Sequence, residues 1–184
     1  MFKFVKKMKD KYIDIIEPIN QLSLYGYKKY FVLLKELFDK KKLPNCILLS
    51  GQKGIGKSMM ANKFINYLNS KNDNIYIENL IKNNVHPNIF RIIKNDDKKN
   101  IEISQIREMI KFQNRSTFDN KIKSIIIDDL DCLNIYSTNA LLKSIEEPNN
   151  NVLFILINNS EKKIPSTLKS RCIEFKLSLK ITDV

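Results

Sequence analysis

Short, mainly apolar segments alternate along the chain with longer stretches whose apolar residues recur at helical spacing. The apolar segments are four to six residues long, the length of strands rather than helices. They lack the polar alternation of a strand with one face in water, so we expect both of their faces to be buried. The pattern predicts five strands, at residues 46–49, 88–93, 123–128, 152–157 and 173–177.

Four helices are expected around these strands, from their apolar spacing and from the residues that can begin or end them. Residues 30–38 and 59–68 each place apolar side chains on one helical face. Ser104 and Ser137 can each cap the N-terminus of a further helix with the side-chain hydroxyl. The helix that begins near Ser137 would stop before Pro148.

Buried strands that alternate with helices are typical of a parallel sheet covered on both faces. We therefore expect an α/β fold in three layers, with functional residues at the carboxyl ends of the strands. A length of 184 residues suffices for one such domain. We expect residues 18–184 to form it, residues 1–17 to be a basic amphipathic extension, and the polar segment 69–85 to be a surface loop or insertion.

Composition narrows the class of protein without indicating a function. Hydrophobic residues make up 43% and charged residues 28% of the chain, which is typical of globular proteins and argues against disorder throughout. The longest apolar run, at residues 152–157, is far shorter than the ~20 residues that span a membrane. The charged N-terminus does not resemble a signal peptide. We expect a soluble, cytoplasmic protein.

The net charge of +12 has two open explanations. It can indicate a surface that binds nucleic acid or another acidic partner. It can equally reflect codon bias, because nearly all the cations are lysines and the sequence is rich in Ile and Asn, a mixture that an AT-rich genome encodes.

The three cysteines, Cys46, Cys132 and Cys172, are far apart and form no Cys-x-x-Cys pair. An odd number at this spacing matches neither a disulfide framework nor a zinc site. We expect cysteines that pack as small buried hydrophobic residues in a reducing compartment, and no bound zinc.

The clearest motif is Gly51-Gln52-Lys53-Gly54-Ile55-Gly56-Lys57-Ser58, which satisfies the P-loop pattern G-x-x-x-x-G-K-[ST]. Glycines let backbone N–H groups wrap phosphate oxygens, and the following helix points its positive end at them. Three of the four glycines in the chain lie in this motif. Lys57 is expected to reach the β- and γ-phosphates of ATP, and Ser58 to coordinate Mg²⁺.

A second nucleotide motif is Ile125-Ile126-Ile127-Asp128-Asp129, an apolar strand that ends in acids. Asp128 is expected to hold the Mg²⁺ coordination shell, as in P-loop NTPases. Asp129 stands where many ATPases have a Glu that orients the attacking water, and its side chain is one methylene shorter. Asp131 can be a third acidic participant, although an ordinary turn residue is the simpler interpretation.

Two further segments resemble the AAA+ ATPase modules of DNA polymerase clamp loaders. They are Asn139-Ala140-Leu141-Leu142-Lys143-Ser144-Ile145-Glu146-Glu147-Pro148 and Ser170-Arg171-Cys172, with Ile164-Pro165 between them. Shorter matches to the delta-prime class of bacterial DNA polymerase III subunits occur at Tyr25-Gly26, Leu43-Pro44-Asn45 and His86-Pro87-Asn88. The resemblance runs from about residue 18 to residue 177 and implies a P-loop NTPase core of the AAA+ type.

The resemblance also implies roles for residues outside the two nucleotide motifs. Arg171 resembles the arginine finger that one clamp-loader subunit inserts into the ATP site of its neighbour. Asn158 or Asn159 corresponds to the polar sensor of the γ-phosphate, and we favour Asn159. Glu146 and Glu147 stand at an expected helix C-terminus, where acids oppose the helix dipole. A cation from a partner, or a contact within the domain, would explain them.

The sequence departs from the clamp-loader pattern at three points. No cysteine lies between the nucleotide motifs, so the four-cysteine zinc module of the gamma/tau type is not expected. Asp129 in place of Glu leaves open whether ATP is hydrolysed, and we expect weak or no ATPase activity of the chain alone. The sequence reaches Val184, so the expected fold is the AAA+ core without the helical lid and collar of the family.

Three hypotheses of function follow. The first is an ATP-binding, delta-prime-like subunit of the DNA polymerase III clamp loader, which helps to load the sliding clamp on primed DNA during replication. Its expected partners are the gamma/tau and delta subunits, the clamp and the DNA. The second is a small P-loop nucleotide kinase, although the arginines that such kinases close over their substrates are scarce between the two motifs. The third is a DNA-binding module without catalysis, based on the charge.

Overall fold

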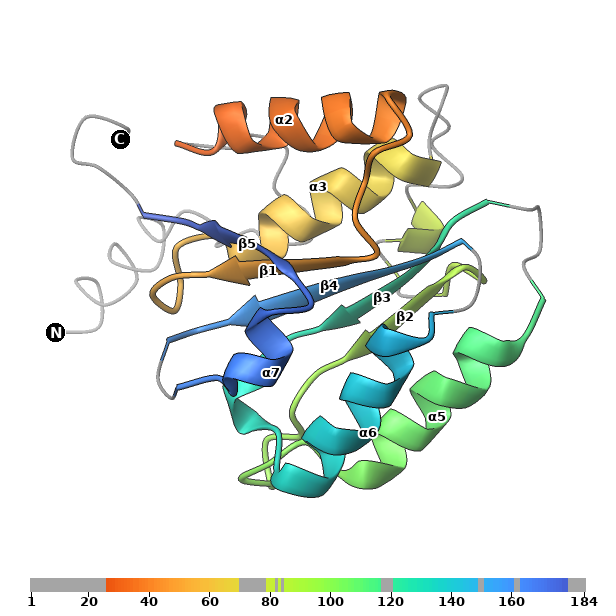
Figure 1. The fold of residues 1–184 in the computed structure, drawn as a ribbon, viewed down its shortest axis with the longest axis vertical. Coiled ribbons are helices and arrows are strands. Elements are labelled where there is room, and N and C mark those ends of the chain that lie inside the picture. Colours follow the sequence, from red (N-terminus) through yellow and green to blue (C-terminus); the bar gives the residue numbers. More distant parts are fainter. Residues whose placement is uncertain are drawn as a thin grey trace, which may run out of the picture.

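The computed structural model describes residues 26–69, 79–81, 83, 85–116, 121–148, 151–160 and 163–178. These residues form a five-stranded parallel sheet with helices on both faces (Figure 1). The strands are β1 (Cys46–Ser50), β2 (Ile89–Ile92), β3 (Lys123–Ile127), β4 (Val152–Asn158) and β5 (Ile173–Lys176), in the spatial order β2-β3-β4-β1-β5. The expected extension at residues 1–17 and most of the expected loop at 69–85 lie outside the described residues.

The helices form the two outer layers. α2 (Lys28–Asp39) and α3 (Lys57–Asn69) cover one face of the sheet (Figure 1). α5 (Ile103–Asn114), α6 (Ile135–Glu146) and the short α7 (Ser166–Lys169) cover the other face. The predicted α/β fold in three layers is therefore confirmed. α7 was not predicted, because four residues are too few to display a helical period. No helix in the described part of the chain is long and apolar enough to cross a membrane.

Side chains along the central strands β1, β3 and β4 alternate between two cores, one on each face of the sheet, whereas the edge strands β2 and β5 are partly exposed. In β1, Cys46 and Leu48 pack with the core under α5, α6 and α7, whereas Ile47 and Leu49 pack with the core under α2 and α3. Every residue of β1 is buried for this reason, and so the strand appears in the sequence as a continuous apolar run.

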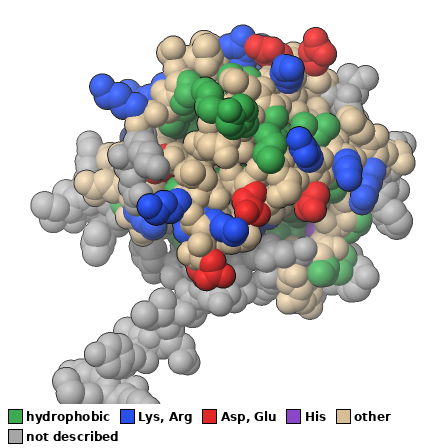
Figure 2. All heavy atoms as spheres, turned by 90° about the horizontal axis from the view of Figure 1, so that it is seen from below, with side chains coloured by type: hydrophobic (Ala, Val, Ile, Leu, Met, Phe, Trp, Pro, Cys, Tyr) green, Lys and Arg blue, Asp and Glu red, His purple; other side chains and the backbone are tan. Residues whose placement is uncertain are grey.

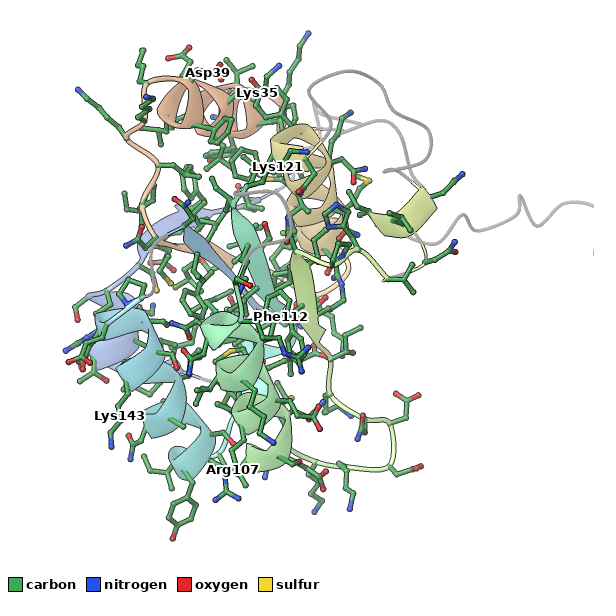
Figure 3. All side chains as sticks on the ribbon, turned by 90° about the vertical axis from the view of Figure 1, so that its right-hand side faces the viewer. Lys35, Asp39, Arg107, Phe112, Lys121 and Lys143 are labelled. Atoms are coloured by element: carbon green, nitrogen blue, oxygen red, sulfur yellow. The ribbon has the colours of Figure 1, made fainter. Side chains whose placement is uncertain are left out.

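The outer surfaces of α5 and α6 carry charged residues. Phe112 extends from α5 toward the sheet, whereas Arg107 and Lys143 extend away from it (Figure 3). Figure 2 shows that the cations on this side are scattered among acids and do not gather in one patch.

Two predicted helix caps are wrong. The N-cap of α5 is Glu102, whose backbone N–H donates to Gln105 Oε1 at 3.1 Å in a reciprocal capping box, so Ser104 lies inside the first turn. The N-cap of α6 is Asn134, whose Oδ1 accepts the backbone N–H of Ser137 at 2.8 Å. The buried Ser137 hydroxyl does not cap α6, since it donates instead to a backbone carbonyl before α5. In both cases a longer polar side chain two or three residues earlier does the capping.

Candidate nucleotide-binding site

The candidate site lies at the carboxyl edge of the sheet, where three neighbouring strands end. β4 lies between β1 and β3 and pairs with both in parallel register. The P-loop (residues 51–58) follows β1, Asp128 follows β3 and Asn159 follows β4, so the three segments come together at one edge. This is the edge at which functional residues are expected in a parallel sheet.

The P-loop backbone adopts conformations that require glycine, as Gly51 and Gly54 illustrate. Gly51 has a φ of +153°, and a Cβ there would lie 2.4 Å from the backbone oxygen of Leu177 and 2.7 Å from Ile55 Cδ1. Gly54 has a φ of +84°, which L side chains rarely adopt. The loop therefore passes tightly beside the end of β5 and then turns back to begin α3 at Lys57.

Lys57 is buried at the base of this loop, with 3% of its surface exposed. Its Nζ donates to the backbone oxygen of Gly51 at 2.9 Å and to that of Gln52. Burial lowers the pKa of Lys57, and the negative charge of Asp128 opposes that shift. A cation held by neutral carbonyls in a buried position is suited to an anionic ligand such as a phosphate.

Ser58 and Asp128 join the P-loop to the end of β3. Ser58 Oγ donates to Asp128 Oδ2 at 2.7 Å, and the other carboxylate oxygen of Asp128 accepts the backbone N–H of Asp129 at 3.1 Å. A hydroxyl and a carboxylate in contact provide the hard oxygen ligands that Mg²⁺ prefers. Ser58 directly follows Lys57 in the sequence, so these oxygen ligands lie close to the buried lysine. The residues present therefore fit a nucleotide with its magnesium ion.

Asp129 has a left-handed backbone, with φ 51° and ψ 48°. Its Oδ1 accepts the side-chain amide of Asn159 at 2.6 Å. Burial, followed by the negative charge of Asp128, raises the pKa of the Asp129 carboxyl. The structure brings Asn159 to this acid, whereas the side-chain oxygen of Asn158 accepts the backbone N–H of Ser160 at 3.1 Å.

Asp131 does more than occupy a turn. It is buried, and its Oδ1 accepts the backbone N–H of Asn159 at 3.4 Å. It thereby helps to hold Asn159 beside Asp129, a positioning contact between the ends of β3 and β4. The sequence alone allowed both a third acidic participant and a plain turn residue at this position.

Arg171 lies at the opposite edge of the sheet. It precedes β5, near the amino end of that strand, whereas the P-loop follows the carboxyl end of the adjacent β1. Its guanidinium forms an ion pair with Glu146, and its Nη1 donates to the backbone oxygen of Thr167 at 2.7 Å. A contact within the domain therefore supplies a cation for Glu146 at the C-terminus of α6, and the structure does not bring Arg171 to its own P-loop.

Sequence reasoning missed a hydrogen-bonded pair near Asp128, formed by a charged arginine and a neutral asparagine. Arg91 of β2 donates to Asn62 Oδ1 on α3, the helix that begins at the P-loop. Burial lowers the pKa of Arg91, and the negative charge of Asp128 opposes that shift. An arginine inside an otherwise apolar strand, 88–93, was the available signal. The pair links the P-loop helix to the strand beside β3.

Comparison with known proteins places the chain in a family. A model of the family described as "DNA polymerase III, delta subunit" matches residues 26–180. The DNA polymerase III subunit gamma of Buchnera aphidicola subsp. Schizaphis graminum is 32% identical over 169 residues, which are 88% of this chain and 46% of the relative. The subunit delta' of the same organism is 35% identical over 162 residues, which are 83% and 47% of the two proteins. The chain thus spans about half the length of these relatives.

Solved structures show the same fold. A DNA polymerase III gamma subunit-related protein of Thermotoga maritima matches with a TM-score of 0.65 and 20% identity, over 83% of this chain and 47% of that one. RuvB of Thermotoga maritima matches with a TM-score of 0.55 and 17% identity, over 91% and 51%. These matches and the sheet topology confirm the expected α/β core of the AAA+ type. Because the family model matches most of its length, this chain belongs to the DNA polymerase III delta subunit family.

Proposed function

We propose that residues 18–184 are the ATP-binding AAA+ core of a delta-prime-like clamp-loader subunit, which helps to load the sliding clamp on primed DNA. One observation carries the nucleotide part of the proposal. The buried Lys57 ammonium lies among loop carbonyls, directly beside the Ser58–Asp128 contact. A cation for phosphate and two oxygen ligands for a metal thus lie close together, although Asp128 is 70 residues from Ser58 along the chain.

In this proposal the chain binds Mg·ATP through residues 51–58. Lys57 and the backbone N–H groups of the loop bind phosphate oxygens, while Ser58 and Asp128 hold the metal. When bound, Mg·ATP supplies the γ-phosphate whose loss would distinguish two states of the subunit. Asp129 is the candidate to orient water and Asn159 the candidate sensor.

Two features support slow hydrolysis by the chain alone. The Asn159 amide occupies one oxygen of Asp129, and an Asp side chain reaches less far than the Glu found at this position in many ATPases. Arg171, the cation that would neutralise charge on the γ-phosphate, is also absent from the chain's own P-loop, because it lies at the other edge of the sheet. In this proposal Arg171 therefore serves a neighbouring subunit, in trans, and not its own P-loop.

The proposed partners are the gamma/tau and delta subunits, the clamp and primed DNA. Family membership supports the first group, since the relatives are named as gamma and delta' subunits of DNA polymerase III. The scattered charges on the α5–α6 side (Figure 2) favour codon bias over a dedicated nucleic-acid surface on that face. DNA would then be bound by the assembled complex.

Reconstitution tests this proposal. Gamma/tau and delta subunits from the same organism are combined with or without the chain, and clamp loading and ATP hydrolysis are measured on primed DNA. We expect both activities to require the chain, and equal rates without it would contradict the proposal. Incubation with ATP and a panel of nucleoside monophosphates tests the kinase alternative, and we expect no phosphoryl transfer.

A further inference from the structure

Cys46 and Cys172 lie side by side at the amino edge of the sheet, although 126 residues separate them. β1 and β5 pair in parallel with Ile47 opposite Ile173, so the two cysteines are neighbours one residue earlier. Both face the core under α5, α6 and α7. The two Sγ atoms are 2.7 Å apart, and both cysteines are free thiols.

The backbone geometry of this pair suits a disulfide. Neighbouring strands lie about 4.7–4.9 Å apart, within the Cα separation of about 4.4–6.8 Å that disulfides span. A bond between the two sulfur atoms therefore requires adjustment of side chains and no movement of either strand. The sequence predicts only that the cysteines pack as small hydrophobic residues. Their spacing along the chain does not reveal this contact, because the contact depends on the pairing of β1 with β5.

The two thiols differ in exposure and in acidity. Cys46 is 2% exposed, whereas Cys172 is partly exposed. Both cysteines line a hollow of about 510 Å³, together with Glu146 and Arg171. The hydrogen bond between the two sulfur atoms lowers the pKa of Cys172, and that same bond together with burial raises the pKa of Cys46. Cys172 is thus the accessible nucleophile, and Cys46 is the protonated partner behind it.

We propose that Cys46 and Cys172 form a reversible disulfide in the presence of a hydroperoxide, and that this bond restrains Arg171. The Cys172 thiolate attacks the peroxide oxygen, the O–O bond breaks, and a sulfenic acid and an alcohol are formed. The Cys46 sulfur then attacks the Cys172 sulfur, and water leaves as the S–S bond forms. Two thiols lose two electrons and two protons in total, and the peroxide is reduced to alcohol and water. A dithiol reductant reverses the reaction.

The restraint follows from the position of Arg171, the residue before Cys172. The Arg171 side chain contacts Glu146 in an ion pair and donates to Thr167 and Ser170 close by in sequence, and its backbone N–H donates to the Leu168 carbonyl. A covalent bond between Cys172 and β1 would fix the peptide that carries this arginine. The consequence for activity rests on the proposed function, in which Arg171 must reach the ATP site of a neighbour.

Peptide mapping tests the disulfide on the chain itself. The chain is treated with hydrogen peroxide, digested without reductant and analysed by mass spectrometry. We expect a linked pair of peptides containing Cys46 and Cys172, which separates on addition of dithiothreitol. The Cys132→Ala variant should retain this bond and the Cys46→Ala variant should lose it. Sulfinic acid at Cys172 with a free Cys46 in the wild-type chain, or bonds between two chains only, would overturn the proposal.

Hydrolysis in the reconstituted complex tests the restraint. We expect oxidation of this chain to lower DNA-stimulated ATP hydrolysis by at least about twofold, with recovery after reduction. The Cys46→Ala variant, which retains Arg171 and Cys172, should be insensitive to peroxide. A mapped disulfide with unchanged hydrolysis would disprove the restraint. If the complex hydrolyses ATP equally well without this chain, the proposed function is wrong. The peptide mapping would still decide whether the disulfide forms.

Discussion

Charged side chains are buried or half-buried and bonded to polar neighbours at the carboxyl edge of the sheet, and they are more exposed at the amino edge. At the carboxyl edge, charged and polar side chains bind one another across the ends of three strands, and Lys57 is 3% exposed. At the amino edge, the main charged contact is the ion pair of Arg171 and Glu146, whose side chains are 36% and 44% exposed.

The carboxyl edge is therefore a preorganised candidate site, whereas Arg171 at the amino edge can move away from its present partner. Buried polar groups that are already held in place lose little freedom when a ligand binds, which favours tight and specific binding. An exposed ion pair contributes only about 0–1 kcal/mol, so Arg171 can leave Glu146 at small cost. The carboxyl edge is therefore suited to hold a ligand of this chain, and the amino edge to offer a cation to another molecule.

The largest effect is expected at the carboxyl edge. The Lys57→Ala variant should bind ATP about 100-fold more weakly or worse, because it removes a buried cation that forms charge-assisted hydrogen bonds with phosphate. Titration with a fluorescent ATP analogue measures this loss, and the exposed Lys40→Ala variant is the matched control. If the wild-type chain does not bind at millimolar nucleotide, the carboxyl edge is not a nucleotide site.

ATP turnover by the chain alone should stay well below ~1 s⁻¹.

A smaller effect, confined to the assembled complex, is expected at the amino edge. The Arg171→Ala variant should bind ATP like the wild-type chain, while DNA-stimulated hydrolysis by the complex falls at least about tenfold, below the range measured for GTPase arginine fingers. The Lys169→Ala variant, which removes a nearby exposed cation, should leave hydrolysis unchanged. If complexes with either variant match the wild type, Arg171 is a structural residue. Loss of ATP binding by the Arg171→Ala chain would instead indicate a role in cis or a damaged fold.

Charge repulsion at the carboxyl edge predicts a modest change of stability. Because the pKa of Asp129 is raised in the folded chain, its ionised form destabilises that state at neutral pH. The destabilisation is lost as the pH falls through that raised pKa, and it is gone below the ordinary pKa of about 3.9. The Asp129→Asn variant retains an oxygen for Asn159 and tolerates the left-handed backbone. Its Tm should exceed that of the wild type by about 1–3 °C at neutral pH.

Circular dichroism at neutral pH and below pH 4 checks this expectation. The gain in Tm should shrink toward zero in acid, and the exposed Asp97→Asn change should give no gain at either pH. A less stable Asp129→Asn variant at neutral pH would show that the Asn159 hydrogen bond outweighs the repulsion from Asp128.

The smallest effect is expected from the removal of zinc, since we predict no zinc site at either edge of the sheet. Within the described residues, no three His, Cys, Asp or Glu side chains are grouped to hold a metal ion by themselves. Metal analysis of the purified chain should find far less than one equivalent of zinc, and a chelator should leave its Tm unchanged. A stoichiometric amount of zinc, or unfolding by the chelator, would show that the cysteines have a ligating role.

Local patterns in the sequence determined the elements and the nucleotide motifs. A strand buried on both faces is mainly apolar, so the central strands β1, β3 and β4 could be recognised from their apolar runs. The partly exposed edge strands β2 and β5 could be recognised from their length and apolar content, and the five together imply the parallel class. The P-loop and the Asp128–Asp129 pair could likewise be identified, since a phosphate and a magnesium ion demand particular residue types at fixed spacing. Each of these signals lies within about ten neighbouring residues.

Only the tertiary structure decided which of these segments meet. Nothing local in β4 shows that it lies between β1 and β3, yet that order brings Asn159 to Asp129. The same holds for the contact of Cys46 with Cys172, and for the opposite edges occupied by the P-loop and Arg171. The order of strands is set by how all the helices and strands bury their apolar surfaces together, and the pattern within any one segment does not contain that information.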